Sequence, residues 1–254
     1  MYKLGLKLWS INTDIYYNEA KKLYAQNLFD YIELYVIPNS TQTIKQWQDI
    51  HIPFIIHCAH STHGFNLAKK EQEKSNLQIY NETKEFADAL NAKYIIFHGG
   101  TDGDIKETAK QLKKFNEKRA VIENKPYLPI PNKINAKICR GYNFDEIKFV
   151  MDEVGCGFCL DFGHAICAAN AFEKEPYSFI DEFINLKPNM FHLTDNDNIN
   201  SPYDSHLHLG EGELNLSKIK AMLPKDAIIT LETNKNSKEN LDDFIRDCDF
   251  MRSF

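Results

Sequence analysis

The sequence predicts an α/β fold, a single-domain (β/α)8 barrel over residues 1–254, from three observations. First, short apolar runs alternate with amphipathic stretches along the whole chain. Second, the runs are too short for helices and too uniformly apolar for half-exposed antiparallel strands, so they fit parallel strands buried on both faces. Third, runs and amphipathic stretches number eight each, which is the count of a TIM barrel.

The predicted strands follow one another at residues 4–9, 31–36, 54–57, 94–98, 120–123, 158–161, 190–193 and 228–232. The predicted helices lie at residues 14–26, 41–48, 66–90, 104–116, 144–153, 171–185, 216–223 and 238–250. A doubly wound open sheet is the alternative, but no G-x-G-x-x-G or Walker A motif follows a predicted strand. Gly and Pro are thinly spread and no linker stands out, which indicates one domain.

Composition excludes several classes of protein. The chain has 30 Lys+Arg against 36 Asp+Glu, a net charge of −6 and 43% hydrophobic residues, so it is not disordered. No apolar run approaches the roughly 18 residues of a membrane span. Residues 1–9 lack the apolar core of a signal peptide and indicate a strand, so we expect a cytoplasmic protein without a membrane partner. The acidic balance argues against non-specific nucleic-acid binding.

The six cysteines are scattered through the chain without a secretory signal, which predicts reduced thiols. Cys156 and Cys159 form a C-x-x-C motif at the start of a predicted strand. Residues three apart in a strand point to opposite faces, so we expect a structural role for this pair rather than a metal or redox role.

A long loop is predicted at residues 123–143, after the fifth strand. Three prolines, Pro126, Pro129 and Pro131, fall within six residues and prevent regular structure. In a barrel this loop lies over the mouth, where it forms either a lid or a structural excursion.

The strongest functional signal is the residue at the end, or one position before the end, of six consecutive predicted strands. Each is an imidazole or a carboxylate, the side chains that bind metals, in the order His57, His98, Glu123, Asp161, His192 and Glu232. Barrel enzymes place their active sites at the carboxyl ends of the strands. At a chance of about one in four per position, drawn from ordinary residue usage, six of six is not a coincidence. We therefore predict an active site there.

Three further residues join this set by local spacing. His164 follows Asp161 by three residues, just beyond the strand, and Asp204 and His206 form a D-x-H pair after the seventh strand. Five imidazoles and four carboxylates in one mouth suit a borderline divalent metal such as zinc, manganese or cobalt. A cation also offsets carboxylates that are costly to bury unpaired.

Four residues are candidates for binding substrate. His60 and His63 leave the third strand and enter a loop, so substrate contact is expected of them before metal binding. Lys125 lies two residues after the end of the fifth strand. Gly210 lies after the seventh strand, where barrels often let a phosphate approach backbone N–H groups.

Other residues near the strand ends are given structural roles. Glu33 lies inside the second predicted strand, where packing or an ion pair is expected rather than catalysis. Gly99, Gly100, Gly210 and Gly212 are expected to be loop glycines with positive φ.

The motifs resemble the xylose isomerase-like barrel superfamily, which includes sugar-phosphate isomerases and epimerases and the endonuclease IV enzymes (AP endonuclease family 2). The resemblance covers about residues 54–233. Its carriers are Ile-Ile-Phe-His98-Gly-Gly, Ile-Glu123-Asn, Cys-Leu-Asp161-Phe-Gly-His164-Ala, Phe-His192-Leu-Thr-Asp195, Asp204-x-His206-x-x-x-Gly-Glu-Gly and Leu-Glu232-Thr.

Resemblance to the ketose epimerases implies one divalent metal held by Glu123, Asp161, His192 and Glu232. It also implies that Glu123 and Glu232 flank a sugar or sugar phosphate as paired acid and base groups. One carboxylate removes a proton next to a metal-bound carbonyl and the other returns it.

Resemblance to endonuclease IV implies a trinuclear zinc site and a nucleic-acid partner. His57, His98 and Glu123 would form one site, and Glu123 would bridge to a second one. The other ligands would be Asp161, His192 and Glu232 for the second ion and His164, Asp204 and His206 for the third. Clustered zinc ions favour cleavage of a phosphodiester.

Three departures favour the isomerase over the nuclease. The N-terminal strand, Leu-Gly-Leu-Lys-Leu-Trp-Ser, lacks the Gly-Ala-His-Val-Ser signature associated with endonuclease IV. The segment between His98 and Glu123 is also short. The first 50 residues carry no basic or aromatic loop suited to a bent duplex. The sequence thus predicts a metal-dependent sugar or sugar-phosphate isomerase or epimerase with one to three ions. A zinc-dependent AP endonuclease is the alternative, an inactive scaffold and a multi-iron oxidase are weaker ones, and the oligomeric state is open.

Overall fold

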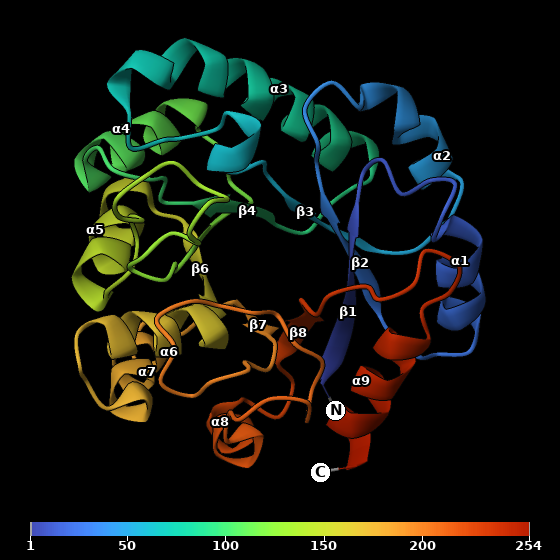
Figure 1. Ribbon diagram of the computed structural model, residues 1–254. Coiled ribbons are helices and arrows are strands. Elements are labelled where there is room, and N and C mark those ends of the chain that lie inside the picture. The colour runs from blue at the N-terminus through green and yellow to red at the C-terminus, as the bar shows by residue number, and fades with distance from the viewer. Residues whose placement is uncertain (1, 254) are drawn as a thin grey trace.

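The computed structural model describes residues 2–253; Met1 and Phe254, the ends of the predicted domain, lie outside the described residues. Parallel strands in chain order form a closed barrel in which β1 pairs with both β2 and β8 (Figure 1). The strands are β1 Lys3–Trp9, β2 Tyr31–Tyr35, β3 Phe54–His57, β4 Ile95–His98, β5 Ala120–Glu123, β6 Gly157–Asp161, β7 Met190–Leu193 and β8 Ile228–Leu231. The predicted (β/α)8 fold is confirmed, and closure excludes the open sheet.

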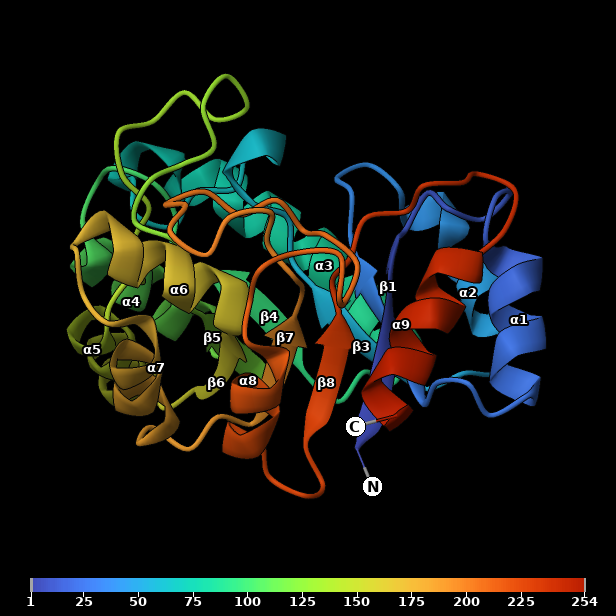
Figure 2. The same cartoon turned by 60° about the horizontal axis from the view of Figure 1, so that its bottom comes forward.

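The helices form a ring outside the barrel, and the last of them lies beside β1 in two views (Figures 1 and 2). They are α1 Tyr17–Ala25, α2 Ile44–Gln48, α3 Glu73–Ala89, α4 Ile105–Phe115, α5 Phe144–Val154, α6 Phe162–Ala171, α7 Pro176–Ile184, α8 Leu216–Met222 and α9 Asp242–Ser253. Short 3-10 segments lie at Thr41–Thr43, Ser61–His63 and Lys70–Gln72. Within the described residues, no helix has the length and apolar character that crossing a membrane requires.

Helix α6 corrects the sequence prediction, which placed no helix between the strand at residues 158–161 and residue 171, and one helix over residues 171–185. That helix, α7, begins only at Pro176. Nearly every side chain of α6 is buried, so its sequence has no polar face and no amphipathic period to detect. Four other predicted helices begin three or more residues later than expected, at Tyr17, Ile44, Glu73 and Asp242, because turns, bends or a 3-10 segment precede them.

The interior of the barrel is divided into two layers by the alternation of side chains along each strand. The lower layer is a cluster of Tyr31, Ile55, Ile96, Val121, Cys159 and Met190. Each of these residues lies two positions before a polar residue of the mouth. Gly5 makes room for the ring of Tyr31, because a Cβ at that position would overlap the ring. An apolar floor therefore supports the polar side chains above it.

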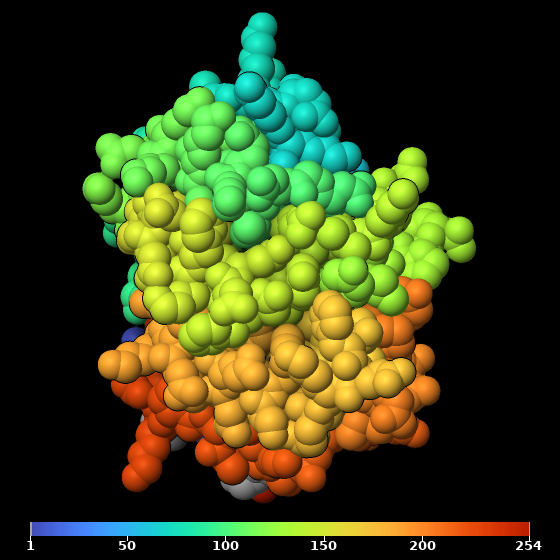
Figure 3. Space-filling model, turned by 90° about the vertical axis from the view of Figure 1, so that its left-hand side faces the viewer, coloured from blue at the N-terminus to red at the C-terminus, as the bar shows by residue number. Residues whose placement is uncertain are grey.

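The segment 124–143 between β5 and α5 is irregular, as predicted. It rises above the carboxyl ends of the strands in Figure 2 and protrudes from the surface in the yellow-green region of Figure 3. Two backbone hydrogen bonds hold its limbs together, from Lys125 N–H to the Gly141 carbonyl (2.9 Å) and from Cys139 N–H to the Tyr127 carbonyl (2.8 Å). This loop forms one wall of the mouth.

All six cysteines fall within the described residues and are free thiols. Two of the four loop glycines correct the prediction. Gly100 (φ 93°) and Gly210 (φ 84°) have the expected positive φ, whereas Gly99 and Gly212 do not. A Cβ at Gly99 would overlap the backbone oxygen of Arg140. Glycine is therefore required at this position because a side chain has no space, not because the backbone angle is unusual.

Candidate metal centre

A cavity of about 540 Å³ opens at the carboxyl ends of the strands, where the sequence places the active site. The predicted ligands His57, His98, His164, Asp204, His206 and Glu232 line this cavity. Glu123, Asp161 and His192 are buried in the barrel mouth, at 1%, 1% and 0% exposure. The structure thus brings all nine predicted ligands to one end of the barrel.

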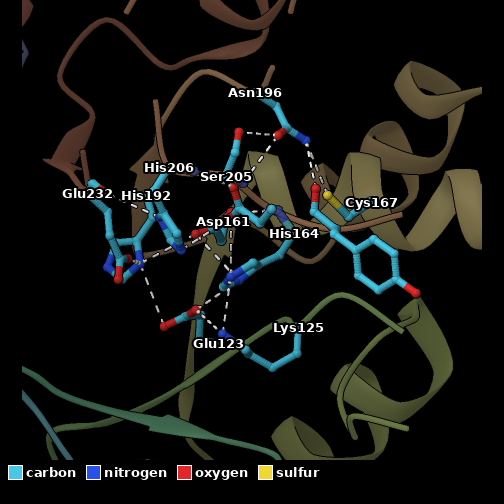
Figure 4. A network of polar contacts seen from close by, with 12 residues as sticks. Glu123, Lys125, Asp161, His164, Cys167, His192, Asn196, Ser205, His206 and Glu232 are labelled. Carbon is cyan, nitrogen blue, oxygen red and sulfur yellow. Dashed lines mark hydrogen bonds and ion pairs between the residues drawn. The ribbon is translucent and has the colours of Figure 1, made fainter. Parts of the chain in front are cut away.

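Glu123 is the central residue of the site (Figure 4). Its Oε2 lies 3.1 Å from Nε2 of His57 and 3.1 Å from Nε2 of His98. Its Oε1 lies 3.0 Å from Nδ1 of His164 and 3.5 Å from Nζ of Lys125. The two oxygens of one carboxylate therefore face side chains from different parts of the mouth, as a bridging ligand does.

Around His192, three carboxylates converge on one ring nitrogen. Nδ1 lies 2.7 Å from Oε2 of Glu232, 3.6 Å from Oε2 of Glu123 and 3.8 Å from Oδ2 of Asp161. These four residues come from β5, β6, β7 and the end of β8. They form the second ligand cluster.

The third cluster is built around Asp204, in the loop after β7. Its Oδ2 lies 3.5 Å from Nε2 of His164 and 3.5 Å from Nε2 of His206. His164 belongs to the first turn of α6, and its backbone N–H donates to Oδ1 of Asp161 (2.7 Å). Asp161 therefore both begins this helix and faces the second cluster.

The ligand atoms form groups in which all members lie within 4.8 Å of one another. The groups are His57–His98–Glu123, Glu123–Asp161–His192, His164–Asp204–His206 and Glu33–His192–Glu232. The first three match the sets that the endonuclease IV resemblance implies, with Glu232 adjoining the second. The fourth contains Glu33, for which an ion pair was expected; that ion pair is present, with Lys7 (2.7 Å).

Acceptors without a hydrogen bond indicate that these residues fit a metal. Among the nine predicted ligands, five buried atoms make no hydrogen bond with residues 2–253: Glu123 Oε1, Asp161 Oδ2, His192 Nδ1, Asp204 Oδ2 and Glu232 Oε2. A buried polar atom without a partner costs about 1–3 kcal/mol. Divalent cations would supply the missing partners, and imidazole nitrogens with carboxylate oxygens are ligands of zinc, manganese and cobalt.

Three of the five imidazoles are oriented by a hydrogen bond from Nδ1 to a backbone carbonyl. Three histidines donate Nδ1–H to a backbone carbonyl: His57 to Cys58 (2.7 Å), His164 to Asn124 (3.0 Å) and His206 to Glu232 (3.1 Å). Each bond leaves Nε2 to face its cluster, which is the usual arrangement behind a metal-binding histidine.

Charge and burial shift the protonation of the cluster in different directions. Burial raises the pKa of Glu123, but interactions with the surrounding His98, Lys125 and His192 outweigh burial and hold that pKa well below its usual range. Burial also raises the pKa of Asp161, and the nearby charge of Asp204 adds to the rise. Burial lowers the pKa of His98 to about 3, so its imidazole is neutral, as a metal ligand must be.

Three of the predicted substrate-binding residues, His60, His63 and Lys125, line the cavity. The ring of His60 stacks on that of His98, with centroids 5.5 Å apart and planes at 5°. His63 Nδ1 lies 2.8 Å from the hydroxyl of Tyr35, which also accepts the His60 backbone N–H (3.0 Å). These side chains form an aromatic wall beside the first cluster.

Gly210 is not available for the phosphate contact expected of it. Its backbone N–H donates to Oδ2 of Asp195 (3.0 Å), and that of Gly212 donates to the same oxygen (3.1 Å). Gly210 is not among the described residues that line the cavity. The carboxylate of Asp195 takes the place that an anionic ligand was expected to fill.

Sequence reasoning missed Lys7 and Tyr35, which line the cavity from β1 and β2. The signal for Lys7 was present, because a lysine inside a buried strand requires an acidic partner. Its partners are Glu33 (2.7 Å) and Glu232 (2.8 Å), both distant in sequence. The pairing therefore depends on the barrel closing.

The fold and the clusters together define a (β/α)8 barrel with a candidate multinuclear metal centre in its mouth. Residues 22–254 match the family model described as xylose isomerase-like TIM barrel, and the chain belongs to this family. It is 28% identical over 208 residues to a protein from Halothermothrix orenii named "Probable endonuclease 4", covering 72% of this chain and 73% of that one.

Two solved structures share the fold. One, titled D-tagatose 3-epimerase-like protein, superposes with a TM-score of 0.75 at 18% identity, covering 99% of this chain and 96% of that one. The other, endonuclease IV from Thermus thermophilus, gives a TM-score of 0.70 at 17% identity, covering 99% and 98%. The chain is therefore similar both to proteins named endonuclease IV and to a protein named epimerase-like.

Proposed function

We propose that the protein is a divalent-metal-dependent phosphoesterase that cleaves a phosphate ester of a sugar, the class that includes the abasic site of a nucleic acid. The observation that carries the proposal is the burial of Glu123. It is 1% exposed, it is not among the described residues that line the cavity, and its oxygens face imidazoles on two sides. This placement suits a bridging ligand better than a base that must reach a substrate C–H bond.

The third cluster supports the same choice. An isomerase with one ion has no need of the His164–Asp204–His206 group, whereas a phosphoesterase with several ions uses it. Ions held by the three clusters would acidify a water molecule and offset the negative charge of the phosphate. The sequence favoured the isomerase, and the third cluster is our reason to prefer the phosphoesterase instead.

Lysines around the cavity suit an anionic substrate. Lys7, Lys125, Lys133 and Lys235 all line it. The ammonium group of Lys125 lies 3.1 Å from Nε2 of His164 and 3.5 Å from Oε1 of Glu123, beside two ligand residues. From there it is placed to contact a phosphate oxygen and to hold the ester against the clusters.

The test uses the full chain loaded with zinc, manganese or cobalt. A duplex with one abasic site, the same duplex without it, and small sugar phosphates are offered as substrates. We expect metal-dependent cleavage of one of these esters, lost at least 10²-fold in Glu123→Gln. Glu117→Gln, which changes the same residue type away from the mouth, is the matched control and should keep full activity. Bound metal without cleavage of any of these phosphate esters would contradict the proposal.

A sugar isomerase or epimerase is the second candidate, and the exposure of Glu232 favours it. The Glu232 side chain is 20% exposed and lines the cavity, so it can reach a substrate proton. The structural likeness to the epimerase-like protein agrees with this reading. The test is deuterium uptake from solvent into a ketose, with about one ion bound per chain. Uptake that is lost in Glu232→Gln would favour the isomerase over the phosphoesterase.

A further inference from the structure

A second group of charged residues lies behind His192, inside the barrel. Glu33 is fully buried, and its Oε2 accepts hydrogen bonds from Nε2–H of His192 (2.8 Å) and from the hydroxyl of Thr230 (2.6 Å). The hydroxyl of Tyr31 lies 2.9 Å from Thr230 Oγ1. Because Thr230 gives its proton to Glu33, Tyr31 donates to Thr230. This chain of bonds fixes the position of Oε2 of Glu33.

Lys7 joins this buried group to the metal centre. Its Nζ lies 2.7 Å from Oε1 of Glu33 and 2.8 Å from Oε1 of Glu232. With Oε1 of Glu232 held in this way, Oε2 of the same carboxylate faces Nδ1 of His192 at 2.7 Å. The group Glu33–His192–Glu232 therefore already contains a cation, the ammonium group of Lys7.

We propose that Glu33 and Lys7 are positioning residues of the metal centre, an inference that rests on the proposed metal site. Glu33 makes Nδ1 the metal-binding nitrogen of His192, and Lys7 turns Oε2 of Glu232 toward the same point. Neither residue is a ligand itself.

The opposite use of the two ring nitrogens supports this assignment. His57, His164 and His206 give Nδ1–H to a neutral backbone carbonyl and keep Nε2 for the clusters. His192 gives Nε2–H to a carboxylate and keeps Nδ1, which makes no hydrogen bond with residues 2–253. A carboxylate behind a histidine fixes its tautomer and increases its basicity as a ligand more than a carbonyl does.

The charge of Lys7 explains how a second buried carboxylate is tolerated beside an acidic cluster. An unpaired carboxylate at this depth would be strongly destabilising. The ammonium group pairs with Glu33 and Glu232 together, so both carboxylates stay ionised. Replacing Lys7 should therefore disturb His192 and Glu232 although the lysine binds no metal.

Cobalt binding measures the effect of Glu33 without any substrate. The full chain is stripped with chelator and titrated with Co²⁺, and the visible absorption of the bound ion reports its ligands. In Glu33→Gln we expect one ion to bind roughly 10–100-fold more weakly, with a changed spectrum, while the other ions bind as before. Lys7→Met should weaken the same ion, and Glu117→Gln should weaken none. Wild-type affinity and spectrum in Glu33→Gln would overturn the proposal.

Nitrogen NMR of the zinc-loaded wild-type protein keeps the proposal falsifiable if either variant fails to fold. We expect the proton of His192 on Nε2, and the protons of His57, His164 and His206 on Nδ1. A proton on Nδ1 of His192 would overturn the assignment. Neither measurement needs catalysis, so bound Co²⁺ without ester cleavage sinks only the proposed phosphoesterase. A chain that binds no Co²⁺ sinks both.

Discussion

Two kinds of buried carboxylate stand side by side in the mouth of this barrel, and their hydrogen bonds separate them. Four carboxylates of the candidate metal centre, Glu123, Asp161, Asp204 and Glu232, each have a buried oxygen without a hydrogen bond to residues 2–253. Asp195 and Asp247 are buried as well, at 1% exposure, but both of their oxygens are bonded. The difference separates the candidate metal ligands from the carboxylates that hold the fold.

Asp195 shows how completely a structural carboxylate is bonded. Its Oδ2 accepts the backbone N–H groups of Gly210 (3.0 Å) and Gly212 (3.1 Å). Its Oδ1 accepts those of Asn196 (2.8 Å) and Leu214 (3.1 Å). The loop that carries Asp204 and His206 is folded around this one carboxylate.

Asp247 does the same for the loops that follow β7 and β8. Its Oδ1 accepts the N–H of Leu209 (2.9 Å), and its Oδ2 lies 2.9 Å from Nδ1 of His208 and accepts the hydroxyl of Thr233 (2.6 Å). Helix α9 thereby holds Thr233, which follows Glu232, and His208 and Leu209, which follow His206. The bonded carboxylates hold in place the ones that lack partners.

The largest expected effect is that of Asp195→Ala. Four backbone N–H groups would lose their acceptor, and each unpaired buried donor costs about 1–3 kcal/mol, so we expect a loss of at least about 3 kcal/mol in the free energy of unfolding. Urea denaturation measures it, with chelator and with zinc. The loss should already be present in chelator, because Asp195 is not among the predicted ligands. A loss below about 1 kcal/mol would remove Asp195 from the structural group.

Gly212→Ala tests the same loop by crowding. A Cβ at Gly212 would overlap the backbone oxygen of Asn196 and the carboxylate of Asp195, so we expect a loss of about 2–3 kcal/mol. Gly64→Ala is the matched control, since its φ of 83° is unfavourable for alanine but its Cβ would meet no described atom within 4 Å. Gly64→Ala should lower the free energy of unfolding by about 1 kcal/mol. Equal losses in thermal denaturation would show that crowding at Gly212 is relieved.

Asp161→Asn should change stability in the opposite direction. Without metal, the substitution removes a buried charge close to other carboxylates while Oδ1 still accepts the His164 N–H, so the free energy of unfolding should rise by about 1 kcal/mol. The stabilisation that zinc gives the wild-type protein should be lost. Thermal denaturation with chelator and with zinc measures both changes. If the variant were less stable than the wild type in chelator, Asp161 would be a carboxylate that holds the fold, like Asp195.

The smallest effect is expected at Glu117, which lies between α4 and β5, away from the mouth, with its side chain 6% exposed. Burial raises the pKa of Glu117, but hydrogen bonds from Arg119 outweigh burial and hold the pKa below its usual value of 4.5. A lowered carboxyl pKa contributes stability that is present above that usual value and is lost as pH falls through the folded-state pKa. The wild type should exceed Glu117→Gln by about 0.5 kcal/mol near neutral pH, with the difference shrinking below about pH 4. A constant difference in urea denaturation across this range would rule out the charge as its cause.

Much of the site was predictable because each ligand is marked by its own neighbours. His98 and Glu123 end short apolar runs, and such a run followed by a ligand-type residue can be recognised without knowledge of the fold. Asp204 and His206 were found from their spacing alone. Alternation of strands and helices then placed these residues at one end of a barrel.

Other features could not be predicted because they depend on residues far apart in the chain. Helix α6 is buried among neighbouring elements and has no amphipathic period. The amide of Gly210 is bonded to Asp195, and Lys7 meets Glu232 across 225 positions. Sequence alone also assigned Glu123 and Glu232 the same role, whereas the structure buries the first and exposes part of the second.

The sequence by itself therefore determined the fold class and the identity of the candidate ligands, since both are encoded in local patterns. Only the tertiary structure decided which carboxylates are bonded and which lack partners. A hydrogen-bond partner from another strand is brought into reach when the barrel closes and aligns the eight strand ends. The distinction between carboxylates that hold the fold and candidate metal ligands therefore depends on that closed arrangement.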